Sequence, residues 1–153
     1  MTNVLTNAPA ETFAQQVEQL VNVEQWLRWF AVHTLLGNQE TNLSNGEGDD
    51  YSLYRGVHAP RFILLPHDLD TVFGLGDSSP DINESIFLAA TQAPIGRLLN
   101  NPAFTGRYYA ILRELIATTF SPAQINPLID QVVGAYLPAS VRDQMMQFIV
   151  NRS

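Results

Sequence analysis

The pattern of apolar and polar positions predicts that the chain begins with two helices. Apolar residues recur at helical spacing over about 11–21, which predicts the first helix. The second is expected between Asn22, a typical N-cap, and Gly37, a typical helix end. Its apolar face is broad, so we expect this helix to be buried in the centre of the fold. Residues 1–9 lack such a pattern and are expected to form a flexible lead-in.

The C-terminal part of the chain predicts four more helices. A short one ends near Asn100, and the next begins after Asn101 as its cap, with Pro102 in its first turn. The third follows Ser121 as its cap. The fourth occupies the segment PASVRDQMMQFIVNRS at the C-terminus.

Two short apolar segments at 51–55 and 61–66 are typical of strands. Only a few residues separate them, so the simplest arrangement is a β-hairpin. The segments 38–50 and 74–85 are polar and contain glycine, as loops do. The 153 residues are therefore expected to form one domain of the α+β class, mainly α, with one small β-hairpin.

Asp68 and Asp70 follow the apolar segment that ends at Pro66. Alternate residues of an extended chain point to the same side, so both carboxylates are expected to project together, with His67 pointing away. Two neighbouring carboxylates repel each other unless a cation lies near them, and Mg²⁺ is typically held by one or two carboxylates plus water and phosphate. The same D-x-D pattern occurs in turns, where Asp accepts hydrogen bonds from local amides, so both interpretations stay open.

A second group of acidic residues precedes the hairpin. Glu47 and Asp49 are expected to be solvated in a loop. Glu40 follows the second helix and Asp50 precedes the first strand, so both are expected to lie near the D-x-D pair. The spacing of these acids does not match an EF-hand calcium loop.

The composition excludes several kinds of site and partner. The chain has no cysteine, and its eight basic residues are all arginine, so thiolate sites and mechanisms that need a lysine cannot be completed by this chain alone. The net charge of −7 argues against a nucleic-acid partner. No apolar run is long enough to span a membrane.

The histidines and the C-terminal arginines have simpler interpretations. His33 is expected to be packed and hydrogen-bonded within the apolar helix, and His58 to be solvated in the hairpin turn. Arg97, Arg107 and Arg113 fall on predicted helices, where most arginines are surface or capping residues. The sequence does not select one of them as an anion ligand.

Four blocks of the sequence stand in a recognisable order: VNVEQWLRWFAVHTLLGNQE, DDYSLYR, RFILLPHDLDTVFG and IGRLLNNPAFTGRYYAILRELIATTFSP. Together they resemble the CotH kinase family of atypical, protein-kinase-like enzymes, named for a spore-coat protein. The resemblance runs from about Val21 to the C-terminus. It implies the fold of a protein-kinase-like C-lobe.

The resemblance assigns roles to the D-x-D segment. Residues 66–74 correspond to the family segment P-W-D-L-D-x-x-F-G, with His67 in place of the tryptophan. Asp68 would be a catalytic residue and the leading Mg²⁺ ligand. Asp70 would support it as a metal and cofactor ligand.

Two positions depart from the family pattern. The family's N-W-D corresponds to residues 38–40, so Glu40, the catalytic residue that would orient or deprotonate a hydroxyl, is one methylene longer than the expected aspartate. The family's N-Y-Y-L-Y begins here at Asp50, which would lie beside the cofactor and adds a negative charge there.

The resemblance also implies cofactors, a partner and a function. Mg²⁺ and ATP are expected, with Ca²⁺ or Mn²⁺ as alternative ions, and a protein with Ser or Thr as substrate. The lysine-bearing N-lobe of the family would lie upstream, so a C-lobe fragment with little or no kinase activity of its own is expected. The expected function is the metal-binding catalytic half of a CotH-like protein kinase.

Two alternatives to that function stay open. One is a non-catalytic pseudokinase or binding module of a spore-coat or cell-surface protein, and the other is a structural domain stabilised by Ca²⁺. An extracytoplasmic, cell-surface or spore-coat location is consistent with the family, and nothing in the residues themselves specifies one.

Overall fold

The computed structural model describes residues 1–38, 50–76, 82–87 and 92–153. Within these ranges the fold is α+β and mainly α, as the sequence predicts, with seven helices and one two-stranded sheet. None of these helices is both long and apolar enough to cross a membrane. In chain order the elements are α1 (Thr2–Asn7), α2 (Ala10–Leu20), α3 (Val23–Leu36), β1 (Tyr51–Tyr54), β2 (Ile63–Pro66), α4 (Ala93–Leu99), α5 (Pro102–Ala117), α6 (Pro122–Val133) and α7 (Ala139–Arg152).

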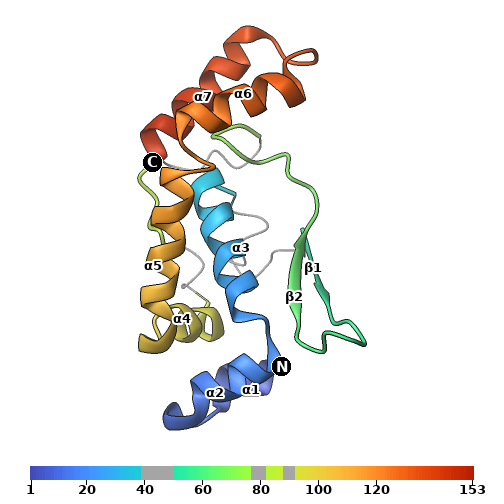
Figure 1. Ribbon diagram of the computed structural model, residues 1–153, viewed down its shortest axis with the longest axis vertical. Coiled ribbons are helices and arrows are strands. Elements are labelled where there is room, and N and C mark those ends of the chain that lie inside the picture. Colours follow the sequence, from blue (N-terminus) through green and yellow to red (C-terminus); the bar gives the residue numbers. More distant parts are fainter. Residues whose placement is uncertain (39–49, 77–81, 88–91) are drawn as a thin grey trace.

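Two long helices, α3 and α5, lie side by side and form the centre of the molecule (Figure 1). The α6–α7 pair covers one end of this centre, the α1–α2 pair lies at the other, and the hairpin flanks α3. Trp26, Phe30, Phe104 and Tyr108, from the two central helices, are among the largest fully buried side chains. The apolar face predicted for α3 is therefore the main wall of the core.

Local capping explains where the central helices begin and end. The side chain of Asn22 accepts a hydrogen bond from the Gln25 amide at 3.2 Å, and Gly37 ends α3 in the left-handed conformation with φ 68°. Asn101 caps α5 in the same way, through the Ala103 amide at 3.0 Å. Both predicted caps are confirmed.

Ser121 precedes α6 as predicted but does not cap it with its side chain. Its hydroxyl donates instead to the carbonyl of Thr118 at 2.7 Å. That bond closes the turn between α5 and α6. The position of the helix start was therefore predictable, and the partner of the serine was not.

The expectation of a flexible lead-in at residues 1–9 is wrong. Residues 2–7 form α1, and Leu5 and Ala8 are buried in the core. The guanidinium of Arg97, on α4, donates to the carbonyls of Thr6 and Ala8 and lies over the ring of Phe13. These tertiary contacts hold a six-residue helix that its own sequence does not stabilise.

The predicted hairpin is confirmed, and α3 holds it in place. β1 and β2 pair antiparallel, with Leu53 opposite Leu64. The side-chain amide of Gln25 donates to the carbonyl of Leu64 at 2.7 Å and accepts from its N–H at 3.0 Å. The indole of Trp26 donates to the carbonyl of Phe62 at 3.0 Å. The outer edge of β2 is therefore paired with side chains of a helix.

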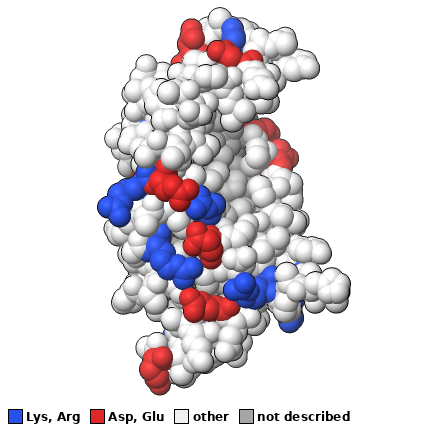
Figure 2. Space-filling model, in the orientation of Figure 1, with Lys and Arg blue, Asp and Glu red and all other residues white. Residues whose placement is uncertain are grey.

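Charged side chains interleave on one face of the molecule (Figure 2). Arg28 on α3 makes a two-bond contact with Glu114 on α5, both bonds at 3.0 Å. These hydrogen bonds raise the pKa of Arg28 and lower the pKa of Glu114. Arg107 contacts Glu18 on α2 at 3.1 Å. Because the charges are exposed, they guide the packing of α2, α3 and α5 more than they stabilise it.

Candidate functional site

The D-x-D segment begins where the hairpin ends. β2 stops at Pro66, and the N–H of His67 donates to the carbonyl of Asp50 at 2.9 Å, which extends the pairing by one residue. Asp68 then adopts a left-handed backbone with φ 52°. The expected extended backbone through Asp68 and Asp70 is therefore wrong, because aspartate tolerates the left-handed region and the chain turns there. Strand alternation does not determine how the two carboxylates point.

The residues after Asp70 form a tight turn. Phe73 has φ 58°, and Gly74 and Gly76 have φ 72° and 89°. A Cβ placed on Gly76 would lie 2.6 Å from the carbonyl oxygen of Asp70, closer than real Cβ atoms approach. Thr71 is almost fully buried. Backbone strain of this kind is often found at functional sites.

The turn is attached to the end of α3. The N–H of Phe73 donates to the carbonyl of Leu36 at 2.8 Å. After Leu36, the chain leaves α3 through Gly37 and then Asn38. The N–H of Asn38 donates to the carbonyl of His33 at 2.9 Å. Asn38 is fully buried. The end of α3 therefore holds both the D-x-D turn and the first residue of the predicted Asn38–Glu40 motif.

Asp68 and Asp70 are both exposed. Across the described ranges, neither carboxylate makes a hydrogen bond or an ion pair. The alternative in which nearby amides satisfy both carboxylates therefore has no support among these residues. Their oxygens are accessible to a ligand from solvent.

The other predicted acids are placed less completely. Asp50 is half-buried and directly precedes β1. Its carbonyl accepts a hydrogen bond from the N–H of His67, the residue before Asp68. The backbone of Asp50 therefore lies near the D-x-D segment, as expected. Glu40, Glu47 and Asp49 lie outside the described residues. Among the residues that are described, no group of three or more His, Asp or Glu side chains forms a metal cluster.

His33 is packed, as predicted, but its expected hydrogen bond is absent within the described chain. The imidazole is 2% exposed, its Nδ1 has no hydrogen-bond partner there, and its ring lies 4.4 Å from that of Trp29. Burial lowers the pKa of His33 to about 4. At neutral pH it is therefore an uncharged core residue. His58 is exposed, as predicted.

A polar network that joins α3, α5, α7 and the segment 82–86 was not predicted. The hydroxyl of Tyr108 donates to the carbonyl of Ile86 at 2.6 Å and lies 3.2 Å from the Thr34 hydroxyl. Burial raises the pKa of Tyr108 to about 12, so it stays a donor at neutral pH. Arg152 donates to the carbonyls of Thr34 and Glu84 at 3.1 and 2.6 Å. These bonds connect the segment 82–86 to α3. No local pattern in the sequence predicts them.

Two of the three arginines left open by the sequence have structural partners. Arg97 is bonded to carbonyls of the N-terminal helix, and Arg107 to Glu18. Arg113 is exposed on α5. Neither Arg97 nor Arg107 is therefore placed as an anion ligand.

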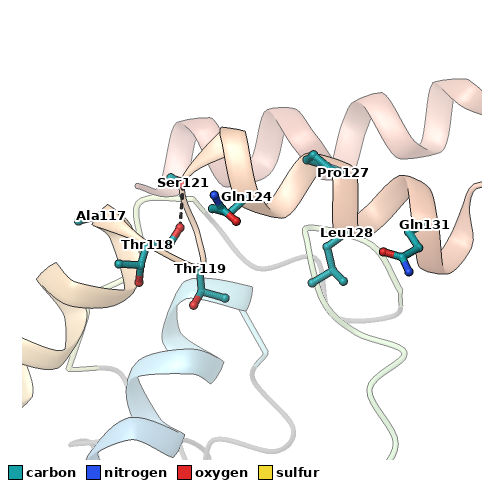
Figure 3. Close-up of a pocket in the computed structure, with 8 residues that line it drawn as sticks. All are labelled: Ala117, Thr118, Thr119, Ser121, Gln124, Pro127, Leu128 and Gln131. Carbon is teal, nitrogen blue, oxygen red and sulfur yellow. Dashed lines mark hydrogen bonds between the residues drawn. The ribbon is translucent and has the colours of Figure 1, made fainter.

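Two of the cavities lie against α6, and the smaller of them is lined in part by Leu36, at the same end of α3 as the D-x-D turn. One, of about 580 Å³, occupies the turn between α5 and α6 and contains no charged residue; Figure 3 shows its lining, Ala117, Thr118, Thr119, Ser121, Gln124, Pro127, Leu128 and Gln131. The other, of about 350 Å³, is apolar and reaches Phe73. Neither contains a carboxylate, so the chemistry of the molecule points to the D-x-D turn and not to these cavities.

Comparison with known protein families shows which family this chain belongs to. The family model described as CotH kinase protein matches residues 1–148. The chain belongs to the CotH kinase family. The family match begins at residue 1, so it includes α1 and α2, which the resemblance read from the sequence left out. No curated protein matches this CotH-family chain.

Proposed function

We propose that this CotH-family chain holds a divalent cation with Asp68 and Asp70 and thereby positions Mg²⁺-ATP for transfer of a phosphoryl group to a Ser or Thr hydroxyl of a protein. One observation carries the proposal. Two exposed carboxylates, without other partners in the described chain, sit on a strained turn that a backbone bond fixes to the end of α3.

The donor set suits Mg²⁺ better than a closed metal site. Two aspartates supply hard oxygen ligands, and Mg²⁺ usually takes one or two such ligands and completes its shell with water and phosphate. A structural zinc site would need four protein ligands. The described residues offer no third carboxylate or histidine to this pair.

Each residue has a defined task in the proposal. Asp68 is the leading ligand, Asp70 supports it, and Asp50 lies on the cofactor side, next to His67. Glu40 orients the hydroxyl or accepts its proton, a role that rests on sequence alone because Glu40 lies outside the described residues. When bound, Mg²⁺ supplies charge neutralisation at the phosphate oxygens. The chain itself mainly positions the cation, the nucleotide and the substrate hydroxyl.

Phosphate contacts by lysine cannot come from this chain, because it contains none. In protein kinases a lysine pairs with the nucleotide phosphates and must be in place for activity. We therefore expect the chain by itself to have little or no kinase activity.

A non-catalytic pseudokinase or binding module is the second candidate. Glu40 and Asp50 both depart from the family pattern, and a longer or more negative side chain at such positions would impair positioning of hydroxyl and phosphate. On this candidate the chain would bind a protein partner, for example at a cell or spore surface, without transferring phosphate.

The test uses Mn²⁺, whose paramagnetism reports binding, in place of Mg²⁺. The D68N/D70N double variant is expected to bind Mn²⁺ at least about tenfold more weakly than the unchanged chain. D143N, which changes an exposed aspartate on α7, is the matched control and should bind as the unchanged chain does. Equal Mn²⁺ affinity in all three proteins would refute the proposal.

Nucleotide binding separates the remaining candidates. Calorimetry with ATP and Mg²⁺ should show binding that depends on Asp68 and Asp70. A melting temperature that Ca²⁺ raises while ATP leaves it unchanged would indicate a Ca²⁺-stabilised structural domain instead.

A further inference from the structure

The hairpin has one protected edge and one open edge. On β2, the N–H and carbonyl of Leu64 face α3, where the Gln25 amide binds both. In an antiparallel pair, directly opposed residues either both bond across the pair or both face outward. Leu53 is opposite Leu64, so its N–H and carbonyl face away from β2. They form the open edge of β1.

Among the residues that the structure describes, the open edge has no protective device. Tyr51 alternates with Leu53, so its backbone groups face the same way, and no group in the described ranges bonds to the backbone of either residue there. Proteins usually protect such edges with a charged side chain, a proline or a bulge. The strand YSLY has none of these, and Leu53 is 41% exposed. An extended peptide is the chemical complement of such an edge.

A pocket lies next to this edge. Its volume is about 380 Å³, and its lining includes Trp26, Tyr51, Leu53, Leu64, Pro94 and Ile95. A residue that pairs with Leu53 on a third strand would project its side chain to the same face of the sheet as Leu53. That side chain would therefore lie over the apolar pocket. Pockets for alternate side chains are what give strand addition its specificity.

The charges at the two ends of β1 are opposite. Asp50 precedes the strand and Arg55 follows it. Asp50 is bonded through its carbonyl to His67, so the acidic end of β1 is also the end at which Asp68 lies. A complementary peptide therefore carries a basic residue opposite Asp50 and an acidic residue opposite Arg55.

We propose that β1 binds an extended segment of the protein substrate as a third, antiparallel strand, with an apolar side chain over the pocket. The identification of this segment as a substrate rests on the proposed function. At about 3.3 Å per residue, the hydroxyl residue reaches the level of Asp68 about four residues C-terminal of the residue that pairs with Leu53. The hydroxyl then lies level with the D-x-D turn but across β1 from β2, two strand spacings or about 10 Å away.

The probe is the blocked peptide Glu-Val-Leu-Val-Thr-Arg-Ser-Gly. Its leucine is designed to pair with Leu53, its arginine to lie opposite Asp50 and its serine to lie level with Asp68 along the strand direction. Binding should slow hydrogen exchange at the Leu53 amide, measured by NMR. No binding up to about 1 mM, or binding that leaves that amide unprotected, would overturn the proposal.

Two matched comparisons sharpen the test. N-methylation of the peptide leucine removes the donor that faces β1 and should weaken binding at least about tenfold, whereas N-methylation of the following valine, whose N–H faces away, should not. L53A should weaken binding, whereas L65A should not, because Leu65 is similarly exposed at 43% but does not line the pocket. Equal effects within either pair would contradict strand addition.

The outcomes also separate this inference from the proposed function. Protection of Leu53 without Mn²⁺ binding at Asp68 and Asp70 would leave a peptide-binding module and refute the kinase role. Mn²⁺ binding without protection of Leu53 would refute strand addition alone. Protection of Leu53 that rises with concentration of the chain itself would assign the edge to a second copy and overturn the proposal.

Discussion

The N–H of Phe73 donates to the carbonyl of Leu36 over 2.8 Å, and this bond joins the D-x-D turn to the last turn of α3. The same helix end positions Asn38, the first residue of the other predicted motif. The two motifs therefore share one anchor. Changes that disturb this anchor should affect cation binding even when they leave both carboxylates in place.

Gly76 offers the clearest test of that anchor. Alanine there would need a left-handed backbone with φ 89° and a Cβ 2.6 Å from the Asp70 carbonyl. We expect G76A to lower the free energy of unfolding by about 2 kcal/mol or more and to weaken Mn²⁺ binding. Chemical denaturation and Mn²⁺ titration measure the two effects.

Gly106 provides the matched control. It lies within α5, and a Cβ there would have no neighbour within 4 Å. We expect G106A to raise the free energy of unfolding by about 1 kcal/mol and to leave Mn²⁺ binding unchanged, because alanine favours helix over glycine. If G76A is as harmless as G106A, the turn is not constrained as described.

His33 should make stability depend on pH. Burial lowers its pKa in the folded chain from 6.5 to about 4, so the unfolded chain binds a proton first as pH falls. The neutral imidazole therefore contributes stability above pH 6.5 that is lost progressively down to about pH 4. The loss amounts to about 3 kcal/mol. Urea denaturation at a series of pH values measures it.

Carboxylates also titrate in this range, so the comparison is between variants. In H33F the difference in unfolding free energy between pH 7 and pH 4 should be smaller than in the unchanged chain. H58Q should retain the full difference, because His58 is exposed. An identical pH dependence in H33F and H58Q would show that His33 is not buried in solution.

Tyr108 and Tyr109 are adjacent but differ in their environments. The Tyr108 hydroxyl is bonded to the Ile86 carbonyl and lies next to Thr34, whereas Tyr109 is 44% exposed. Y108F should lower the free energy of unfolding by about 1–2 kcal/mol, because it leaves buried polar groups unpaired. Y109F should have little effect. Equal stability of the two variants in urea denaturation would contradict the network.

Arg97 should hold the N-terminal helix in place. R97A removes the hydrogen bonds to the carbonyls of Thr6 and Ala8 and the contact with the Phe13 ring. We expect a loss of about 2 kcal/mol and faster hydrogen exchange in α1. R113A, an exposed arginine on α5, is the control. Unchanged exchange in α1 of R97A would show that apolar contacts alone hold that helix.

Local signals explain what the sequence could predict. Asn22, Gly37 and Asn101 act on backbone groups within three residues, so the ends of α3 and the start of α5 could be read directly. The two short strands lie only a few residues apart in the sequence, so their pairing could also be predicted, although α3 holds the hairpin in place. The D-x-D motif marked its candidate site because it combines residue type, spacing and a position after a strand.

Tertiary contacts explain what the sequence could not predict. The helix at residues 2–7 depends on Arg97, which lies about ninety positions later in the chain. The left-handed backbone of Asp68 depends on a turn that is closed by the distant helix α3. Neither contact leaves a periodic pattern, so a reading of the sequence treats the first as loop and the second as extended chain.

The contact between Gln25 and Leu64 has a mechanical consequence. The Gln25 amide uses one N–H donor and its oxygen acceptor on Leu64, as a neighbouring peptide group would, so glutamate or lysine at this position would leave a main-chain group of Leu64 unsatisfied. A rotation of α3 by one residue, about 100°, would move Gln25 out of reach of the strand. The orientation of the hairpin and the rotation of α3 about its axis are thus coupled through Gln25, and a molecule that binds one of these elements also constrains the other.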